Sequence, residues 1–505
     1  MDALASSDAL ASSDALASSA CSAASAASAA SASSASSAAS ASRLRVAFAA
    51  STAADWAYIA EGALNVALRY TGDEAALQGL VLRVRKENPS ASFAASGHCP
   101  WHESLRFLDD VVVPLLGRRY VQPALVVPLP VGLAAALDAR AHAARPAKRR
   151  VHPFDGAVPT GLLMSDCSRL AHGAGPSICV ELKLKCGFVP SACPFVSSEA
   201  KRRVDRFTMH QQLKLAQGEV ARVSRYSPPD LFSYDCARVR GALRALVDEP
   251  QNNLRVFRDG VRIFPASSDG EEDAEAEAGE TGGGAAKASP AGGAAALGAA
   301  LGQDPAPLLE ALAQALLREP LLARVEAMQR LDDCDVEGVH RAFAAIEARG
   351  ETLAPLADGG PVAPRAPPPP HVAPDQAAAG FLDTREHQHD TLRRFMISCT
   401  AKDCSAMIVL RAAGASGSEA EAAAEAALAV PPLPPLPPPL PPPPSRDAAP
   451  ERGGPRGQGR VGDWLYACAL VDLDPKPLAK MPGYLKQDRA ICALYASLEA
   501  AGKLA

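Results

Sequence analysis

The segment CVELKLKCGFVP, residues 179–190, decides how this chain is organised. It places Glu181, Lys183 and Lys185 at alternate positions. Alternate side chains of a strand lie on one face, about 7 Å apart. Such a row of charges suits either a surface that binds an anion or an exposed edge strand that carries charge for solubility. The segment therefore predicts a strand that ends at the following CGF and Pro190, with its charged face toward a ligand or toward solvent.

Charge is unevenly distributed along the chain, although the formal net charge of the 505 residues is only −5. Residues 269–280 carry seven acidic residues and no basic one. Residues 181–225 carry nine Lys and Arg against four Asp and Glu. The acidic run predicts a solvated, disordered segment, and the basic block predicts a site for an anion.

Composition indicates that the ordered core is smaller than the length implies. Hydrophobic residues make up 48% of the chain, but only 5% are aromatic and many are alanine. We expect a low-complexity extension over residues 1–42 and disordered insertions over 266–306, 350–379 and 411–462. The proline run VPPLPPLPPPLPPPPS favours an extended left-handed helix. We interpret it as loop expansion, with an SH3-like or profilin-like partner as the alternative.

Targeting signals are weak. Residues 1–42 lack a basic start and a sustained apolar stretch, which argues against a secretory signal. Their Ser and Ala content faintly resembles a transit peptide, but three Asp and no Arg argue against one. No apolar run reaches 18 residues, so we expect no membrane span. The 12 cysteines form no C-x-x-C pair, a pattern that suits a reducing compartment. We therefore expect a cytoplasmic or nuclear protein, or one found in both compartments.

Alternating and helical patterns together predict an α+β protein with two lobes, over residues 43–165 and 166–500. In the first lobe, LNVALRY and LVLRVRK read as strands, and SLRFLDDVVVPLLG reads as a helix. In the second, one long helix over 199–217 is expected. NLRVFRDGVRIF predicts a hairpin that turns at Asp259 and Gly260.

Two patterns suit the binding of phosphate groups. In YIAEGALNVALRY, Gly62 and small residues separate two strands, so backbone N–H groups could close over phosphates, although the motif alone favours an ordinary hairpin. RFTMHQQLK places Arg206, His210 and Lys214 near one helix face. Each pattern alone is more often structural than functional.

Two aspartates lie next to predicted strands, at positions where catalytic carboxylates are often found. CTAKDCSAMIVL sets Asp403 in a turn before a strand, and LVDLDPKPLAKMPGYLKQD ends an apolar strand with Asp472. An Asp at the end of a strand commonly holds Mg²⁺ against a nucleotide, with a helix cap as the alternative interpretation. The many basic residues exceed what ATP alone would need, which predicts a second, densely anionic substrate.

The blocks EGALNVALRY, ELKLKCGFVP, RFTMHQQLK, YSPPDLFS, PQNNLRVF, TAKDCSAMI and VDLDPKPLAKM resemble the inositol-pentakisphosphate 2-kinase family and occur in its order. The resemblance covers a little under half of the chain. It implies a two-lobed inositol-phosphate kinase fold, distantly related to protein kinases. It also implies ATP and Mg²⁺ as cofactors, and transfer of phosphate to the 2-hydroxyl of inositol 1,3,4,5,6-pentakisphosphate to give the hexakisphosphate, phytate. We expect a monomer that binds neither nucleic acid nor membrane.

The resemblance also implies roles for individual residues. Asp403 would orient or deprotonate the 2-hydroxyl, Lys183 would contact the ATP phosphates, and Asp472 would bind Mg²⁺. The other residues on the ATP side would be Gly62, Asn65, Val66, Arg83, Ser165, Asp166, Cys167, Glu181 and Arg255. The shell around the inositol phosphate would comprise Arg149, Lys185, Lys214, Asn252, Asn253, Lys476, Lys480 and Tyr484.

The sequence departs from the family pattern at several positions. Ala60 replaces a glycine of the covering loop, Leu184 replaces the proline of E-x-K-P-K, and Lys480 stands where arginine is common. KENPS lacks a basic residue expected after the second strand. Plant members carry a zinc site of two His and a C-x-x-C, but here only His340 persists and no cysteine pair follows it. We therefore predict no structural zinc.

The altered loop leaves two alternatives to an active 2-kinase. One is a non-catalytic protein that binds inositol polyphosphate, although it would have no need for both Asp403 and Asp472. The other is an inositol-phosphate kinase with a different positional specificity.

Overall fold

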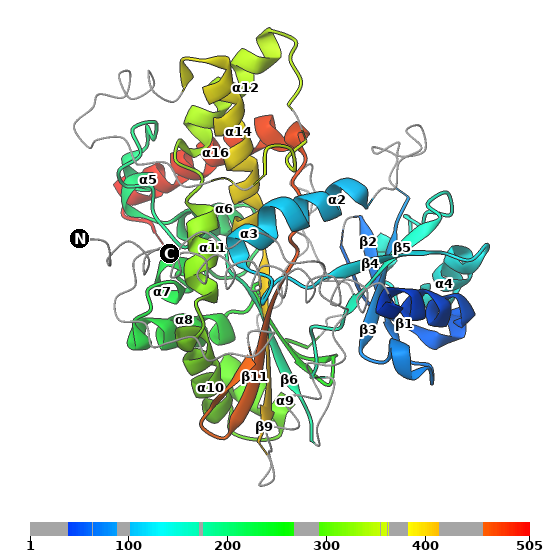
Figure 1. Ribbon diagram of the computed structural model, residues 1–505. Coiled ribbons are helices and arrows are strands. Elements are labelled where there is room, and N and C mark those ends of the chain that lie inside the picture. The colour runs from blue at the N-terminus through cyan, green and yellow to red at the C-terminus, as the bar shows by residue number, and fades with distance from the viewer. Residues whose placement is uncertain are drawn as a thin grey trace, which may run out of the picture.

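The computed structural model describes residues 39–62, 64–87, 101–170, 175–266, 292–353, 355–360, 362, 382–413 and 458–504. Two antiparallel sheets organise these residues, and helices cover the larger sheet (Figure 1). The predicted α+β class is confirmed. The hairpin turning at Asp259 and Gly260 is also confirmed, with Gly260 at φ +77°.

The N-terminal sheet has the strand order β1-β2-β3-β5-β4. Its strands are β1 (Trp56–Glu61), β2 (Asn65–Tyr70), β3 (Leu80–Arg85), β4 (Ala124–Pro128) and β5 (Thr160–Ser165). Helix α4 (Leu133–Ala141) and the helical residues 39–50 pack with it around a separate core that includes Phe48, Trp56 and Leu137. We call this unit the N-terminal lobe.

The second sheet has the strand order β10-β11-β9-β6-β7-β8. Its strands are β6 (Ile178–Lys183), β7 (Leu254–Arg258), β8 (Val261–Phe264), β9 (Ser405–Ala412), β10 (Gln458–Val461) and β11 (Trp464–Val471). The charged segment that opened the sequence analysis forms β6, in the interior of this sheet. The exposed edge-strand interpretation is therefore wrong.

Helices surround this sheet, and α12, α14 and α16 gather at one end of it (Figure 1). The principal helices are α2 (His102–Phe107), α3 (Val113–Leu116), α5 (Glu199–Arg203), α6 (Arg206–Ala216), α7 (Pro228–Leu231), α8 (Cys236–Asp248), α9 (Gly293–Leu301), α10 (Ala306–Arg318), α11 (Leu321–Gln329), α12 (Asp335–Ala348), α14 (Arg385–Lys402) and α16 (Met481–Ala500). Together with the second sheet they form the C-terminal lobe. Its core includes Val180, Leu182 and Leu243, which are almost fully buried.

The single helix expected over 199–217 is two helices, α5 and α6. The break lies at Asp205, whose backbone is extended and whose side chain accepts a hydrogen bond from the backbone N–H of Thr208. An aspartate at this position caps a new helix by satisfying one of its free N–H groups. The cap fixes the start of α6, and with it the face that carries Lys214.

The expected boundaries of the lobes and insertions need correction. Helices α2 and α3, assigned to the first lobe, contribute Phe107, Val112 and Leu116 to the C-terminal core. Their apolar faces are better buried there than on the small N-terminal sheet. Residues 39–42, expected within the low-complexity extension, are helical, and residues 1–38 lie outside the described part.

Parts of all three expected insertions are packed structure. Helix α9 packs on α8 and β8 through the buried Leu297, because its alanines and leucines give it an apolar face. Ala357 and Val362 are buried in the same core, and β10 extends the large sheet. The remainder, 267–291, 363–381 and 414–457, lies outside the described residues. No helix in the described part is both long and apolar enough to span a membrane.

Candidate active site

One face of the C-terminal sheet carries the candidate site, and the strand register arranges its side chains in three rows. Glu181 of β6 pairs with Arg255 of β7 and with Met407 of β9. Directly paired residues of antiparallel strands project to the same face, and rows two residues apart are separated by about 7 Å. The middle row is therefore Arg255, Glu181, Met407 and, on β11, Ala469.

The first row, on one side of this middle row, is apolar. It contains Phe257, Cys179, Val409 and Ala467. Phe257, Cys179 and Val409 form a small hydrophobic cluster with Met407 and Ala469, and Cys167 and Leu170 cover it from the segment after β5.

A pocket lies between this apolar surface and the segment that joins the two sheets. Such a pocket, apolar with a few polar groups at its rim, suits a flat heterocyclic ligand. Its lining consists of Gln122, Ser165, Asp166, Cys167, Arg169, Leu170, Met407, Val409, Gln458, Ala467, Cys468 and Ala469.

Ser165, Asp166 and Cys167, which the resemblance assigns to the ATP side, all line this pocket. The carboxylate of Asp166 is already engaged, because Arg69 donates to it over 2.6 Å and Ser168 also contacts it. These partners fix the carboxylate of Asp166 in place. The hydroxyl group of Ser165 and the thiol of Cys167 suit a direct contact with a ligand better than the carboxylate of Asp166 does.

The third row, on the other side of the middle row, is charged. Lys183 pairs with Ser405 of β9, and its backbone N–H donates to the carbonyl of Asn253 over 2.9 Å. Asn253 and Ser405 are almost fully buried, and among the described residues the Oδ1 and Oγ atoms of these side chains have no hydrogen-bond partner. Buried polar atoms without partners are rare and mark places where a ligand or water completes the structure.

Lys185 does not continue the alternation that the sequence predicted. Strand β6 ends at Lys183, and Lys185 has φ +55°, a left-handed conformation that is strained for a residue with a side chain. Its backbone carbonyl is held by the side chain of Gln329 over 2.6 Å. The chain thereby turns Lys185 out of the row of Lys183 and toward Asp403, which acts on it electrostatically.

Asp403 and Lys476 form an ion pair at this end of the sheet. Asp403 ends α14, immediately before β9, and Lys476 lies on the segment after β11. Burial alone would raise the pKa of Asp403, but Lys476, Lys185 and Lys183 outweigh it and leave that pKa below its ordinary value. The carboxylate is therefore ionised at neutral pH and can only accept hydrogen bonds.

Lys185 and Lys476 act electrostatically on Asp403, and Lys214 acts on Lys185. Lys185, Lys214 and Lys476 influence one another or the carboxylate electrostatically. Burial, and then repulsion by Lys183, lowers the pKa of Lys185 to about 8. Burial, and then repulsion by Lys185, lowers that of Lys214 to about 8. Such crowding of like charges indicates a site prepared for an anion.

Arg206 and His210, which share a helix face with Lys214 and had no predicted role, also interact with this cluster. Arg206 acts electrostatically on Lys185 and on Tyr484. Burial and the neighbouring Arg206 and Lys214 lower the pKa of His210 to about 3, so it is neutral. The i, i+4, i+8 spacing was the available signal.

The remaining predicted shell residues differ in position. Tyr484 lies within the electrostatic reach of Asp403, and Lys480 is exposed one helical turn before it, at the start of α16. Asn252 adjoins Asn253 at the start of β7. Arg149 ends a 3₁₀ turn (Ala147–Arg149) in the N-terminal lobe and accepts a hydrogen bond on its carbonyl from Arg145.

Asp472 follows β11 and is a candidate metal ligand. It is exposed, has φ +62° and acts electrostatically on Glu181. Burial raises the pKa of Glu181, Arg255 opposes this, and Asp472 adds to it. Carboxylate oxygens are the ligands that Mg²⁺ prefers. A divalent cation near these two carboxylates would relieve their repulsion, so the residues present fit such an ion.

Asp474, two residues further, contacts the N-terminal lobe. Its carboxylate lies 3.4 Å from a guanidinium nitrogen of Arg83 on β3. The backbone of Val121, which precedes β4, forms an isolated parallel bridge with that of Leu470 of β11. The ion pair links Arg83, predicted on the ATP side, to the segment that follows β11.

The predicted covering loop is the turn between β1 and β2. Gly62 has open space around its Cα, and its N–H donates to the carbonyl of Asn65 over 2.9 Å. Ala60 lies where the pairing of the two strands shifts register, which reflects an irregular backbone. Val66 is fully buried in the N-terminal core, so any ligand contact by Val66 is limited to its backbone. The buried Oδ1 of Asn65 has no partner among the described residues.

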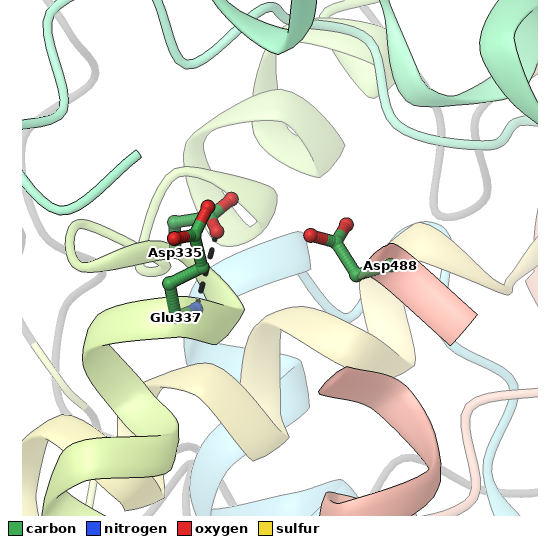
Figure 2. Close-up of side chains that lie close together, drawn as sticks. All are labelled: Asp335, Glu337 and Asp488. Carbon is green, nitrogen blue, oxygen red and sulfur yellow. Dashed lines mark hydrogen bonds between the residues drawn. The ribbon is translucent and has the colours of Figure 1, made fainter. Parts of the chain in front are cut away.

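A second cluster of carboxylates lies away from this face. Asp335, Glu337 and Asp488 approach one another closely enough to share a metal ion (Figure 2). The ammonium group of Lys201 already lies between two of them, 2.6 Å from Asp335 and 2.7 Å from Asp488. Arg206 also lies 3.2 Å from Asp488, so two cations of the chain partly offset the three carboxylates.

The sequence of this chain matches a family model and several curated proteins. The family model described as inositol-pentakisphosphate 2-kinase matches residues 58–490. Inositol-pentakisphosphate 2-kinase IPK1 of Oryza sativa subsp. indica is 28% identical over 473 residues, covering 88% of this chain and 94% of that protein. The Arabidopsis thaliana inositol-pentakisphosphate 2-kinase is 28% identical and covers 88% of this chain and 93% of its own length. The Danio rerio protein of the same name is 35% identical over 43% of this chain and 46% of its own length.

Proposed function

Because the chain belongs to the inositol-pentakisphosphate 2-kinase family, we propose that it transfers the γ-phosphoryl group of ATP to the 2-hydroxyl of inositol 1,3,4,5,6-pentakisphosphate. The product is inositol hexakisphosphate. The observation that carries the proposal is the ion pair between Lys476 and Asp403, with Lys185 acting on the same carboxylate and Lys214 acting on Lys185.

The three rows of side chains suggest how ATP would be oriented on this face of the sheet. The apolar first row and Cys167 would contact the base. Lys183 and Arg255 would contact its phosphates, and Asp472, with Glu181 beside it, would hold Mg²⁺. When bound, that ion neutralises charge on the phosphates. Since successive rows are about 7 Å apart, the γ-phosphate would lie near the end of the sheet, beside Asp403.

Asp403 is proposed to orient the acceptor hydroxyl more than to deprotonate it. Its lowered pKa makes it a weak base, but keeps it ionised to accept the hydroxyl proton as a hydrogen bond. Phosphoryl transfer depends mainly on alignment and charge neutralisation, so a weak base is sufficient. Lys476, which contacts Asp403 directly, would turn to a phosphate of the substrate once that substrate is bound.

The basic shell accounts for the second substrate. Each phosphate group carries about 1.5 to 2 negative charges at neutral pH, so five of them need many cations. Arg206 is proposed to join the predicted shell, because it acts on the same cluster. Lys480 and Arg149 would approach the substrate from the start of α16 and from the N-terminal lobe.

We also propose a specific fold, oligomeric state and location for this chain. The antiparallel N-terminal sheet and the larger lobe, with a pocket where they join, support a two-lobed inositol-phosphate kinase fold distantly related to protein kinases. We propose a monomer in the cytoplasm or nucleus. The described cysteines are free, which suits a reducing compartment.

The direct test is incubation of the purified chain with ATP, Mg²⁺ and each pentakisphosphate isomer, followed by ion-exchange separation of the products. We expect the isomer with a free 2-hydroxyl to give hexakisphosphate. Products from other isomers only would contradict the positional specificity.

Asp403→Asn provides the matched control for that assay. The change preserves shape but removes the charge that orients the hydroxyl, so turnover should fall by about 10³-fold or more while inositol phosphate still binds. Tight binding without any turnover by the wild-type chain would instead support a non-catalytic binding protein. Near-normal turnover by Asp403→Asn would show that this carboxylate has no catalytic role.

A further inference from the structure

An amide side chain lies at the apolar end of the proposed nucleotide cleft without an assigned role. Gln458 is the first residue of the edge strand β10 and pairs directly with Ala467 of β11. Ala467 pairs in turn with Val409, which pairs with Cys179. The register therefore puts the side chain of Gln458 on the same face, in the apolar first row.

The amide nitrogen of Gln458 is buried and has no hydrogen-bond partner among the described residues. The side chain nevertheless lines the pocket that Cys167 and Met407 also line. A buried donor without an acceptor destabilises the ligand-free protein, and a ligand that supplies the acceptor recovers that free energy.

Several polar groups in or beside the pocket are already engaged. The carboxylate of Asp166 receives hydrogen bonds from Arg69 and Ser168, and it is also close to Arg169. The thiols of Cys167 and Cys179 point to backbone carbonyls at 3.6 and 3.7 Å. Gln458 thus offers a donor that no described residue of the chain accepts.

We propose that Gln458 donates a hydrogen bond from its amide nitrogen to a ring nitrogen of the purine base, and that it thereby contributes to the choice of nucleotide. The inference rests on the proposed function, which places ATP along this face. Ring nitrogens of a purine are acceptors that lie in the plane of the base, and a base packed on the apolar row would present one edge to the edge strand. A site with a buried donor discriminates against ligands that lack the matching acceptor.

The test uses the full-length chain and three ATP analogues, in which N1, N3 or N7 of adenine is replaced by C–H. Dissociation constants measured by calorimetry would be compared for wild type, Gln458→Met and Arg460→Met. Methionine keeps the length of glutamine without the donor. Arg460 is an exposed residue of the same strand, two positions further from the pocket, and serves as the control.

For wild type, we expect one analogue to bind about tenfold more weakly than ATP, which is the effect of one hydrogen bond. Gln458→Met should bind ATP about tenfold more weakly and should no longer distinguish that analogue from ATP. Arg460→Met should behave as wild type, and the KM for inositol pentakisphosphate should be unchanged in both variants.

Two results would overturn the inference. One is unchanged ATP affinity in Gln458→Met. The other is an equal loss for ATP and all three analogues, which would indicate a structural role. If Gln458→Met does not fold, Gln458→Glu answers the same comparison, because it replaces the donor by an acceptor. Failure of the wild-type chain to phosphorylate any pentakisphosphate would overturn the proposed function instead, and the binding data would still decide the role of Gln458.

Discussion

At the scale of single residues, the site is built from groups that are unfavourable without a ligand. Lys185 and Asp472 both have left-handed backbones, and Lys185 and Lys214 repel each other in a buried setting. Strain of this kind persists at functional sites because surrounding structure imposes it. The sequence identified these residues through motifs, but it could not show that the chain turns at Lys185, since that turn depends on Gln329, which is distant in sequence.

The two lowered lysine pKa values predict how substrate capture depends on pH. Both ammonium groups are charged below pH 8 and lose their protons as the pH rises through about 8. The value of kcat/KM for inositol pentakisphosphate should therefore fall above that pH. In Lys214→Met the alkaline decline should be shallower, because one of the two groups is absent. A flat profile between pH 7 and 9 would contradict this assignment.

The same pKa shift predicts that Lys214 weakens the ligand-free fold. Its folded pKa lies below the unfolded value, so the unfolded chain binds more protons between pH 8 and 10.5, and stability should rise with pH across that interval. Below pH 8 the charged lysine destabilises the native state in full. Lys214→Met should thus raise the free energy of unfolding at pH 7 by about 1–3 kcal/mol while it weakens substrate binding. Urea unfolding of ligand-free protein would measure it.

At the scale of elements, the strands were more predictable than their neighbours. The alternating pattern of LNVALRY and the Asp-Gly turn identified β2 and the β7–β8 hairpin directly. The interior position of β6 was not predictable, because it depends on pairing with β9, more than 200 residues later in the chain. Helix α9 was missed because its low-complexity composition resembles that of the segment before it.

One buried ion pair network joins three helices and should dominate the stability of the C-terminal lobe. The ammonium of Lys201 in α5 contacts Asp335 of α12 and Asp488 of α16 (Figure 2 shows the carboxylates). Lys201→Met would leave two buried carboxylates facing each other, so the free energy of unfolding should fall by about 3–5 kcal/mol. Arg203→Met, which removes the exposed pair with Glu499, is the control and should cost at most about 1 kcal/mol. Equal effects of the two changes would contradict the prediction.

The connection between α12 and α14 should not depend on zinc. Glu351, just after α12, contacts Arg349 at 2.6 Å, Arg385 at 2.6 Å and His389 at 2.9 Å. His340 packs at a tilt against the ring of Phe343. We predict less than about 0.1 zinc per chain by elemental analysis, since an ion cluster already links the segments that a tetrahedral site would need.

The ion pairs of Glu351 with Arg349, Arg385 and His389 allow the predicted absence of zinc to be tested in a second way. Hydrogen bonds from Arg349 and His389 lower the pKa of Glu351 to about 2. Its contribution to stability is therefore present above the ordinary glutamate pKa and is lost as the pH falls toward 2. Glu351→Gln should lower the melting temperature at pH 7, and a chelator should leave it unchanged. A chelator that destabilises the wild-type protein would point to a bound metal.

At the scale of the whole molecule, Arg69 connects the two lobes where the proposed nucleotide pocket begins. It projects from β2 and donates to Asp166 over 2.6 Å, to Ser168 over 2.9 Å and to the carbonyl of Gly260 over 3.2 Å. A side chain added at Gly260 would meet the guanidinium at 2.1 Å, so the glycine is required both by its φ of +77° and by this approach. The sequence predicted the turn but not its partner, which lies in the other lobe.

Arg69→Met should therefore loosen the lobes without changing either core. The buried Asp166 would lose its principal cation, and Gly260 would lose one hydrogen bond, which together should cost about 2–4 kcal/mol. Because Asp166 and Ser165 line the pocket, the KM for ATP should rise by about tenfold or more, while the affinity for inositol phosphate, held mainly by the C-terminal lobe, should change much less. Hydrogen exchange would locate the effect, with faster exchange expected at the segment after β5 and in the β7–β8 turn.

A ligand titration separates this role from general destabilisation. Saturation with ATP at 100 times its dissociation constant should stabilise the wild-type protein by about 2.7 kcal/mol, and it should stabilise the variant less at the same concentration because the pocket is no longer preformed. Arg118→Met, which removes a partly exposed pair with Asp109 at 3.2 Å, is the matched control and should leave the ATP response unchanged. If Arg69→Met lowered the melting temperature yet kept the full ATP response, Arg69 would hold the lobes together without shaping the nucleotide pocket.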